Sequence, residues 1–195
     1  MQESRSVEGV ILAAGSSRRA HAFKPALMIG GESMITRSIG GMRGLCGRVI
    51  VVGGYDFERL RTLVGTIPGV ECVENPSYEK GMFTSVKKGL SCVRAERCFV
   101  LPADIPLVPT SVYEHLLSVD AEVVIPSFGG RTGHPVCCSA QVIPRILREP
   151  DSSSFRDVLR AIGFRTVPVD AGEILIDIDT PGEWEEVQKR FLPGE

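Results

Sequence analysis

A loop of small, hydroxyl-bearing and basic residues follows the first apolar stretch of the chain. The segment Gly15-Ser16-Ser17-Arg18-Arg19 follows the apolar run of residues 7–14, and Lys24 comes five residues later. No carboxylate occurs between Glu8 and Glu32. Glycine allows close backbone approach to a ligand, and guanidinium groups and backbone N–H groups suit phosphate oxygens. The loop is therefore predicted to bind a polyphosphate, with a solvated basic loop as the alternative.

Two acidic segments supply candidate metal ligands. Asp104 comes soon after the apolar residues 98–101, where a carboxylate costs desolvation free energy unless it meets a cation or several donors. Asp177 and Asp179 alternate along an extended segment, so both face one side and can share a cation. Mg²⁺ favours one or two carboxylates together with substrate phosphates. The alternative is a capping role for Asp104 in a helix or turn, and for Asp179 or Thr180 in the terminal helix.

Two common nucleotide-binding motifs are absent. No Gly-x-Gly-x-x-Gly follows residues 7–13 or 48–52, which argues against a dinucleotide-dependent oxidoreductase. No Gly-x-x-x-x-Gly-Lys-Ser/Thr occurs anywhere in the chain, which argues against a P-loop enzyme.

Alternating strands and helices must position these residues. The continuous apolar runs are typical of strands buried on both faces, and the intervening segments have helical spacing. Strands are predicted at residues 7–13, 48–52, 98–101, 123–125, 135–138, 166–169 and 174–176, and helices at 34–42, 57–64, 82–93, 109–119, 141–147, 155–162 and 181–191. This order predicts one α/β domain over residues 1–195, with a mostly parallel sheet covered on both faces. Ligands of such sheets bind at the carboxyl ends of the strands.

Composition narrows the class of protein. The 195 residues are 43% hydrophobic and 24% charged, as in an ordinary globular domain. The net charge of −2 supplies no overall positive field that would attract nucleic acid. No apolar run approaches the roughly 20 residues of a membrane span, and the polar start does not resemble a signal peptide. We therefore expect a cytoplasmic protein. The six cysteines lack Cys-x-x-Cys spacing, which favours reduced core residues over zinc ligands or disulfides.

The first loop resembles the signature of the molybdenum cofactor nucleotidyltransferases, Leu-Ala-Ala-Gly-x-Ser-x-Arg-Met-Gly-x-x-Lys. The resemblance implies that the loop residues wrap the nucleotide, and that Arg19 and Lys24 neutralise the triphosphate. The implied loop residues are Leu12, Ala13, Ala14, Gly15, Ser16 and Ser17. Ala20-His21 stands where the family has Met-Gly, so the match is incomplete there.

Four later segments also resemble the family, in its order. Ala103-Asp104-Ile105-Pro106 is similar to its Gly-Asp-x-Pro metal motif, with Ala103 in place of the glycine, and residues 177–181 match its Asp-x-Asp-Thr-Pro. These matches imply metal ligands at Asp104, Asp177 and Asp179. The motif does not decide between the last two, and Asp177 is the slightly preferred ligand. The resemblance implies nucleotide contacts at Asn75, Gly81 and Ser85, and acceptor contacts at Gly133, His134 and Pro135. Helix or turn capping is the alternative for several of these residues, and Arg156 is a further candidate that could face an anionic acceptor.

The implied fold is a three-layer α/β/α sandwich of the GT-A-like nucleotidyltransferases. The implied reaction is Mg²⁺-dependent transfer of a nucleoside monophosphate, CMP from CTP, to a phosphorylated small molecule such as molybdopterin, catalysed by Arg19, Lys24 and Asp104. A sugar-phosphate nucleotidyltransferase, a nucleotide-sugar glycosyltransferase and a non-catalytic nucleotide-binding regulator are the alternatives. We expect neither nucleic acid nor membrane as a partner, and the oligomeric state stays open.

Overall fold

The main sheet has eight strands, most of them parallel. The structure is a computed structural model that describes residues 7–15 and 23–191. The strand order is β10-β7-β9-β6-β1-β4-β5, with β8 paired to β7. Strands β9 and β8 pair antiparallel with their neighbours and the other pairs are parallel. The strands are β1 (Val7–Leu12), β4 (Arg48–Gly53), β5 (Val70–Glu74), β6 (Arg97–Pro102), β7 (Val123–Phe128), β8 (Arg131–Thr132), β9 (Val136–Ser139) and β10 (Arg165–Pro168).

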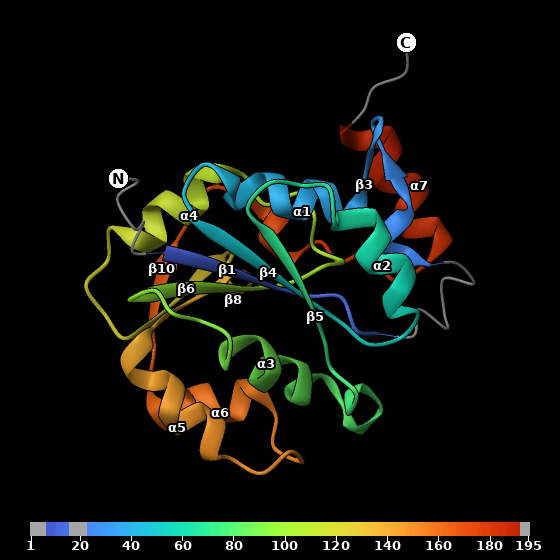
Figure 1. Cartoon of the computed structure of the whole chain (residues 1–195). Coiled ribbons are helices and arrows are strands. Elements are labelled where there is room, and N and C mark those ends of the chain that lie inside the picture. Colours follow the sequence, from blue (N-terminus) through green and yellow to red (C-terminus); the bar gives the residue numbers. More distant parts are fainter. Residues whose placement is uncertain (1–6, 16–22, 192–195) are drawn as a thin grey trace, which may run out of the picture.

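Helices cover both faces of this sheet, as Figure 1 shows. Helices α1 (Met34–Arg43), α2 (Phe57–Val64) and α4 (Thr110–Leu117) pack on one face, and α3 (Met82–Leu90), α5 (Ile143–Arg148) and α6 (Phe155–Ile162) pack on the other. Each face has its own apolar cluster, because alternate side chains of the buried strands point to opposite sides. The predicted three-layer α/β/α arrangement is confirmed. In the part of the chain that the structure describes, no helix is long and apolar enough to cross a membrane.

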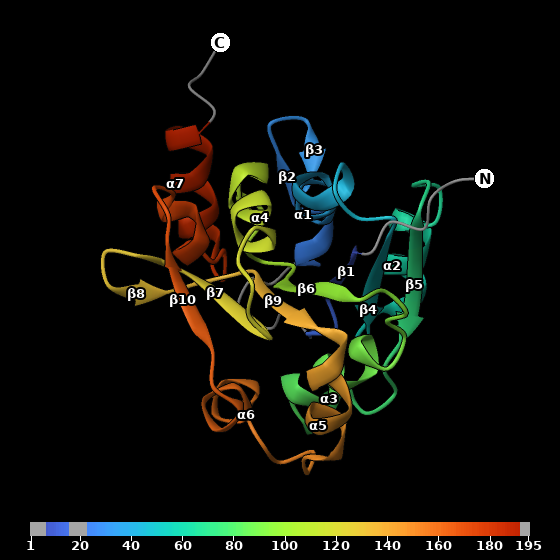
Figure 2. The same cartoon turned by 90° about the vertical axis from the view of Figure 1, so that its left-hand side faces the viewer.

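A short hairpin near the start of the chain packs with the last helix beside the main sheet. The hairpin of β2 (Met28–Ile29) and β3 (Glu32–Ser33) lies next to α7 (Pro181–Phe191) in Figure 1, and in Figure 2 both lie in the upper part of the molecule, with α4 drawn between them. A separate cluster of buried apolar side chains holds the two together: Ile29, Met34, Ile178 and Val187. The Nε1 atom of Trp184 also donates to the carbonyl of Met28 at 2.9 Å. The last helix is thereby fastened to a segment near the start of the chain.

Two parts of the predicted secondary structure were wrong. Residues 174–176 are not a strand, because Gly172–Leu175 form a 3₁₀ helix. Three apolar residues are too few to distinguish the two, and the Ile174 carbonyl accepts from the backbone N–H of His134 instead of a strand partner. Strand β5 was missed because its residues at the sheet edge are half-buried or exposed and form no continuous apolar run.

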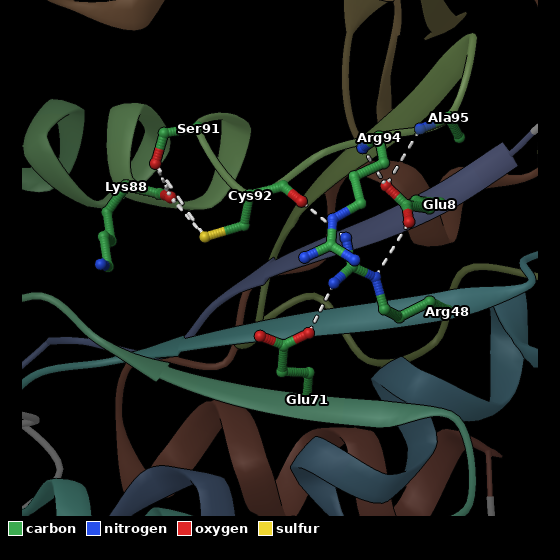
Figure 3. A network of polar contacts seen from close by, with 8 residues as sticks. All are labelled: Glu8, Arg48, Glu71, Lys88, Ser91, Cys92, Arg94 and Ala95. Carbon is green, nitrogen blue, oxygen red and sulfur yellow. Dashed lines mark hydrogen bonds and ion pairs between the residues drawn. The ribbon is translucent and has the colours of Figure 1, made fainter.

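A polar network fastens the amino ends of the central strands (Figure 3). The buried carboxylate of Glu8 in β1 accepts from Nε of Arg48 at 2.9 Å and from the backbone N–H groups of Arg94 at 2.7 Å and Ala95 at 3.3 Å. The Arg48 guanidinium also donates to Glu71 on β5. This network ties β1, β4 and β5 to the segment before β6, at the edge of the sheet away from the strands' carboxyl ends.

Candidate active site

The carboxyl ends of the strands gather most of the predicted site residues on one edge of the sheet. Ala13 follows β1 and donates to the carbonyl of Val52 in β4 at 2.8 Å. Asp104 lies two residues after the end of β6. Gly133, His134 and Pro135 precede β9, which runs antiparallel to β6 and so begins at this same edge. The sheet therefore brings the motifs from the two halves of the chain together.

The ammonium group of Lys24 lies between two carboxylates. Its Nζ is 2.6 Å from Oδ1 of Asp179 and 3.5 Å from Oδ2 of Asp104, and its side chain is 13% exposed. Lys24 begins a 3₁₀ helix, Lys24–Ala26, whereas Asp179 immediately precedes the segment that opens α7. Burial raises the pKa of Asp104, the nearby charge of Asp179 raises it further, and Lys24 lowers it. Two acids thus converge on one cation, in a setting where an uncompensated charge is costly.

This pair of carboxylates fits a divalent metal ion. Within residues 7–15 and 23–191, no group of three or more His, Cys, Asp or Glu side chains is placed to hold a metal. Mg²⁺ does not require one, since it takes one or two carboxylates and completes its shell with phosphates and water. Asp104 and Asp179 already share a cation through the oxygens that such an ion would use. Asp177 is exposed, whereas Lys24 contacts Asp104 and Asp179.

The capping alternative applies to Thr180 rather than to Asp179. Glu183 Oε2 accepts from the backbone N–H of Asp179 at 2.9 Å and of Thr180 at 2.7 Å, while Thr180 Oγ1 accepts from the backbone N–H of Glu183 at 3.3 Å. This reciprocal pair is a capping box at the start of α7. It fixes the backbone at Asp179 and leaves that carboxylate directed to Lys24.

The first loop is described only in part. Ser16, Ser17 and Arg19 lie outside the described residues. Leu12, Ala13 and Ala14 are buried. Their backbone is bonded to the ends of β4 and β6: the N–H of Ala13 donates to the Val52 carbonyl, and the N–H of Ala103 donates to the Leu12 carbonyl at 3.0 Å. Gly15 is exposed, and a Cβ built there meets no described atom within 4 Å. Packing against the described residues therefore does not require glycine at position 15.

Two of the residues predicted to contact the nucleotide, Asn75 and Ser85, are hydrogen-bonded to each other. The buried Asn75 donates from Nδ2 to Thr84 Oγ1 and to Ser85 Oγ, at 2.9 Å each, and its Oδ1 accepts from the backbone N–H of Ser77 at 3.0 Å. Gly81 opens α3 with φ +120°, a conformation that side chains rarely adopt. Asn75 and Ser85 thus position the segment around Gly81, whose backbone is exposed at the edge of the site.

A cavity of about 600 Å³ adjoins this segment. Gly81 lines one side of it, and Gly133 and His134 line another, whereas Pro135 is buried and does not line it. A Cβ at Gly133 would lie 2.4 Å from the carbonyl oxygen of Ile174, so only glycine allows this close approach. Burial lowers the pKa of His134 to about 4, and its buried Nδ1 has no hydrogen-bond partner among the described residues. The imidazole is therefore neutral at physiological pH.

The cavity walls combine aromatic and basic side chains that come from α3, from α6 and from the 3₁₀ helix Tyr78–Lys80. The rings of Phe83 and Phe155 stack with centroids 6.5 Å apart. Three basic residues also line the cavity: Lys80, Arg156 and Arg160. Lys87 fastens the two walls, because its Nζ donates to the Glu149 carbonyl and to Asp151 Oδ1, at 2.8 Å each. Among these residues the sequence pointed only to Arg156, because the side chains come together through the packing of helices distant in the chain.

The chain is similar to proteins that transfer nucleotides. It is 27% identical to the molybdenum cofactor cytidylyltransferase of Escherichia coli over 187 residues, which are 95% of this chain and 97% of that protein. It is 28% identical to a probable molybdenum cofactor guanylyltransferase of Pelotomaculum thermopropionicum over 123 residues, 62% of this chain and 57% of that one.

Solved structures show the same fold. A nucleotidyl transferase from Methanothermobacter thermautotroptrophicus superposes with a TM-score of 0.83, 17% identity, and coverage of 95% and 97% of the two chains. Rv0371C of Mycobacterium tuberculosis in complex with manganese superposes with a TM-score of 0.75, 20% identity, and coverage of 94% and 98%. The model of the MobA-like NTP transferase domain matches residues 9–167. Since this match covers most of the chain, the protein belongs to the MobA-like NTP transferase family of nucleotidyltransferases.

Proposed function

We propose that this protein transfers CMP from CTP to a phosphorylated small molecule, molybdopterin, and releases pyrophosphate. The observation that carries the proposal is the convergence of Lys24, Asp104 and Asp179 at the carboxyl edge of the sheet. A buried cation with two carboxylates suits the triphosphate and a divalent metal that such a transfer needs. The similarity to a cytidylyltransferase over 95% of the chain supports the choice of CTP.

The chemistry needs positioning and charge neutralisation more than proton transfer. A phosphate monoester has a second pKa of about 6, so the acceptor phosphate is largely ionised at neutral pH and attacks the α-phosphorus without a strong base. Asp104 and Asp179 would hold Mg²⁺, which neutralises phosphate charge when bound. Lys24, with Arg19 from the first loop, would bind the phosphate oxygens of the triphosphate. Burial lowers the pKa of His134 to about 4, so this imidazole is a weak base, in keeping with a mechanism that does not need one.

The cavity beside Gly81 suits the acceptor. Its volume of about 600 Å³ lies in the range of small-molecule sites, roughly 300–1,000 Å³. The half-buried Phe155 ring offers apolar surface for a flat heterocycle, and Arg156 offers a guanidinium for an anionic group. Gly133 and His134, predicted to contact the acceptor, line this cavity.

Calorimetry with CTP, GTP, ATP and UTP, each with Mg²⁺, tests the nucleotide and metal sites. We expect selective CTP binding by the wild type, and binding weakened by at least tenfold in Asp104→Ala, because that variant removes one of two carboxylates at the metal. Asp120→Ala, an exposed carboxylate after α4, is the matched control and should bind as the wild type does. If no triphosphate binds, the proposed function is wrong.

Pyrophosphate release then tests the acceptor. We expect release with CTP and molybdopterin, and none with sugar 1-phosphates in its place. Release with sugar phosphates alone would identify a sugar-phosphate nucleotidyltransferase instead. Triphosphate binding without release with either acceptor class would indicate a nucleotide-binding regulator.

A further inference from the structure

The side chain of Lys24 occupies the space that the two predicted metal ligands share. Its ammonium lies 2.6 Å from Asp179 and 3.5 Å from Asp104, and the three side chains are 13%, 24% and 30% exposed. The two acids act on each other as well, since the charge of Asp179 raises the pKa of Asp104. The cation therefore offsets a repulsion that the fold would otherwise leave in a partly buried site.

A divalent ion and this ammonium group cannot use the same carboxylate oxygens together. Mg²⁺ binds oxygen at about 2.0–2.1 Å, so an ion on Asp104 and Asp179 would lie where the Lys24 ammonium now lies or directly against it. The two cations would repel each other in surroundings that screen charge less than water does. Metal binding through Asp179 Oδ1 and Asp104 Oδ2, the oxygens that now contact Lys24, thus requires the ammonium to move.

The backbone around Lys24 allows the side chain to move without the loop. Lys24 starts a 3₁₀ helix with Pro25 buried beneath it, and the N–H of Leu27 donates to the Lys24 carbonyl at 2.9 Å. The N–H of Met34 in turn donates to the carbonyl of Leu27 at 2.8 Å. The backbone is held, whereas the four-carbon stem of lysine is flexible. A displaced ammonium still needs an anion, because leaving it buried and unpaired is costly.

We propose that Lys24 is a built-in counter-ion of Asp104 and Asp179, which makes divalent-cation binding conditional on the triphosphate. Without nucleotide, the ammonium group competes with the metal and keeps its affinity low. With nucleotide, the triphosphate takes the Lys24 ammonium and frees the two carboxylates for the metal. This inference rests on the proposed triphosphate site. Because coupling between two ligands is reciprocal, the metal must raise the affinity for nucleotide by the same factor by which the nucleotide raises the affinity for metal.

The test is the binding of Mn²⁺, followed by the loss of the free-ion signal in electron paramagnetic resonance, at pH 8. Wild type, Lys24→Met and Lys24→Arg are compared with and without the non-hydrolysable α,β-methylene analogue of CTP. We expect Lys24→Met to bind Mn²⁺ about tenfold more tightly than the wild type in the absence of nucleotide, within the range typical of coupled sites. Lys24→Arg keeps the positive charge and should bind Mn²⁺ as weakly as the wild type.

The analogue should increase the Mn²⁺ affinity of the wild type strongly and that of Lys24→Met only slightly. Lys189→Met, an exposed lysine on α7, is the matched control and should behave as the wild type in both conditions. Thermal unfolding with and without Mn²⁺ gives a second measure, and the ion should stabilise Lys24→Met more than the wild type. Equal or weaker Mn²⁺ binding by Lys24→Met, with normal analogue binding by the wild type, overturns the inference alone. Failure of the wild type to bind the analogue overturns both the proposed function and the coupling.

Discussion

The Nζ atom of Lys24 lies 2.6 Å from Oδ1 of Asp179, although the two residues are 155 positions apart in the chain. The contact depends on the packing of α7 against the β2–β3 hairpin, in which Ile178 and Val187 are buried with Ile29. The C-terminal helix is therefore part of the site and not an appendage of the sheet. The apolar contacts of α7 with the hairpin thus hold Asp179 in position beside Lys24, although they do not themselves involve either polar side chain.

The first prediction separates the two aspartates of the Asp-Ile-Asp-Thr-Pro segment. Asp179→Asn should weaken Mg²⁺-dependent CTP binding by at least tenfold, because it removes a carboxylate that already holds a cation. Asp177→Asn should bind CTP and Mg²⁺ nearly as the wild type does, because Asp177 is exposed and Lys24 contacts Asp179 in its place. Calorimetry on both variants checks this. The reverse order of effects would make Asp177 the metal ligand.

The second prediction concerns the capping box that fixes Asp179. Thr180→Ala removes the hydroxyl that accepts from Glu183 N–H, and should lower the free energy of unfolding by about 1 kcal/mol. It should also weaken CTP binding modestly, because the Glu183 carboxylate that accepts from the Asp179 N–H loses its hydrogen bond from the Thr180 hydroxyl. Denaturant unfolding and calorimetry measure the two effects. Glu186→Gln, on an exposed position of α7, is the control, and equal effects of the two substitutions would contradict a capping role.

The sequence predicts the strands of the sheet centre better than its edges. Continuous apolar runs mark β1 and β4 because both faces of these strands are buried. At the edge, β5 has exposed residues such as Glu71 and Glu74, and its pattern resembles that of a loop. A run of apolar residues in the sequence marks a strand that is buried on both faces, so it does not reveal an edge strand whose residues are partly exposed.

The site is predictable where chemistry follows a buried strand and not where it depends on packing. Asp104 stands out because a carboxylate directly after an apolar strand needs a partner. Alternation gives Asp177 and Asp179 the same direction, and only the turn into α7 decides that Asp179 contacts Lys24. The cavity walls meet through the contact of Phe83 with Phe155, from helices that no local pattern relates.

The third prediction tests why glycine occupies position 15. A Cβ at Gly15 meets no described atom within 4 Å, so Gly15→Ala should retain the stability of the wild type. It should nevertheless weaken CTP binding by at least tenfold if phosphate oxygens approach the backbone there, as they do in phosphate-binding loops. Gly40→Ala is the control, because Gly40 is exposed on α1 and a Cβ there also meets nothing. Normal CTP binding by Gly15→Ala would remove the argument for ligand approach.

The fourth prediction concerns the network at the opposite edge of the sheet, in which Glu8 is the shared acceptor (Figure 3). Burial alone would raise the pKa of Glu8, but Arg48 and the backbone donors of Arg94 and Ala95 outweigh it, and the pKa is lowered. A carboxylate with a lowered pKa in the folded state stabilises the protein above its unfolded pKa of about 4.3, and this stabilisation is lost as the pH falls through the folded value.

Glu8→Gln should therefore lower the free energy of unfolding at pH 7 by about 3 kcal/mol, as expected when one partner of a buried ion pair is removed. The difference from the wild type should shrink as the pH falls below about 4, because the wild type then loses the same charge. Urea unfolding at a series of pH values measures both. Glu71→Gln, at the exposed end of the same network with a side chain 48% exposed, should cost less than about 1 kcal/mol. A difference between wild type and Glu8→Gln that stays constant from pH 7 to pH 3 would show that shape, and not charge, is what Glu8 contributes.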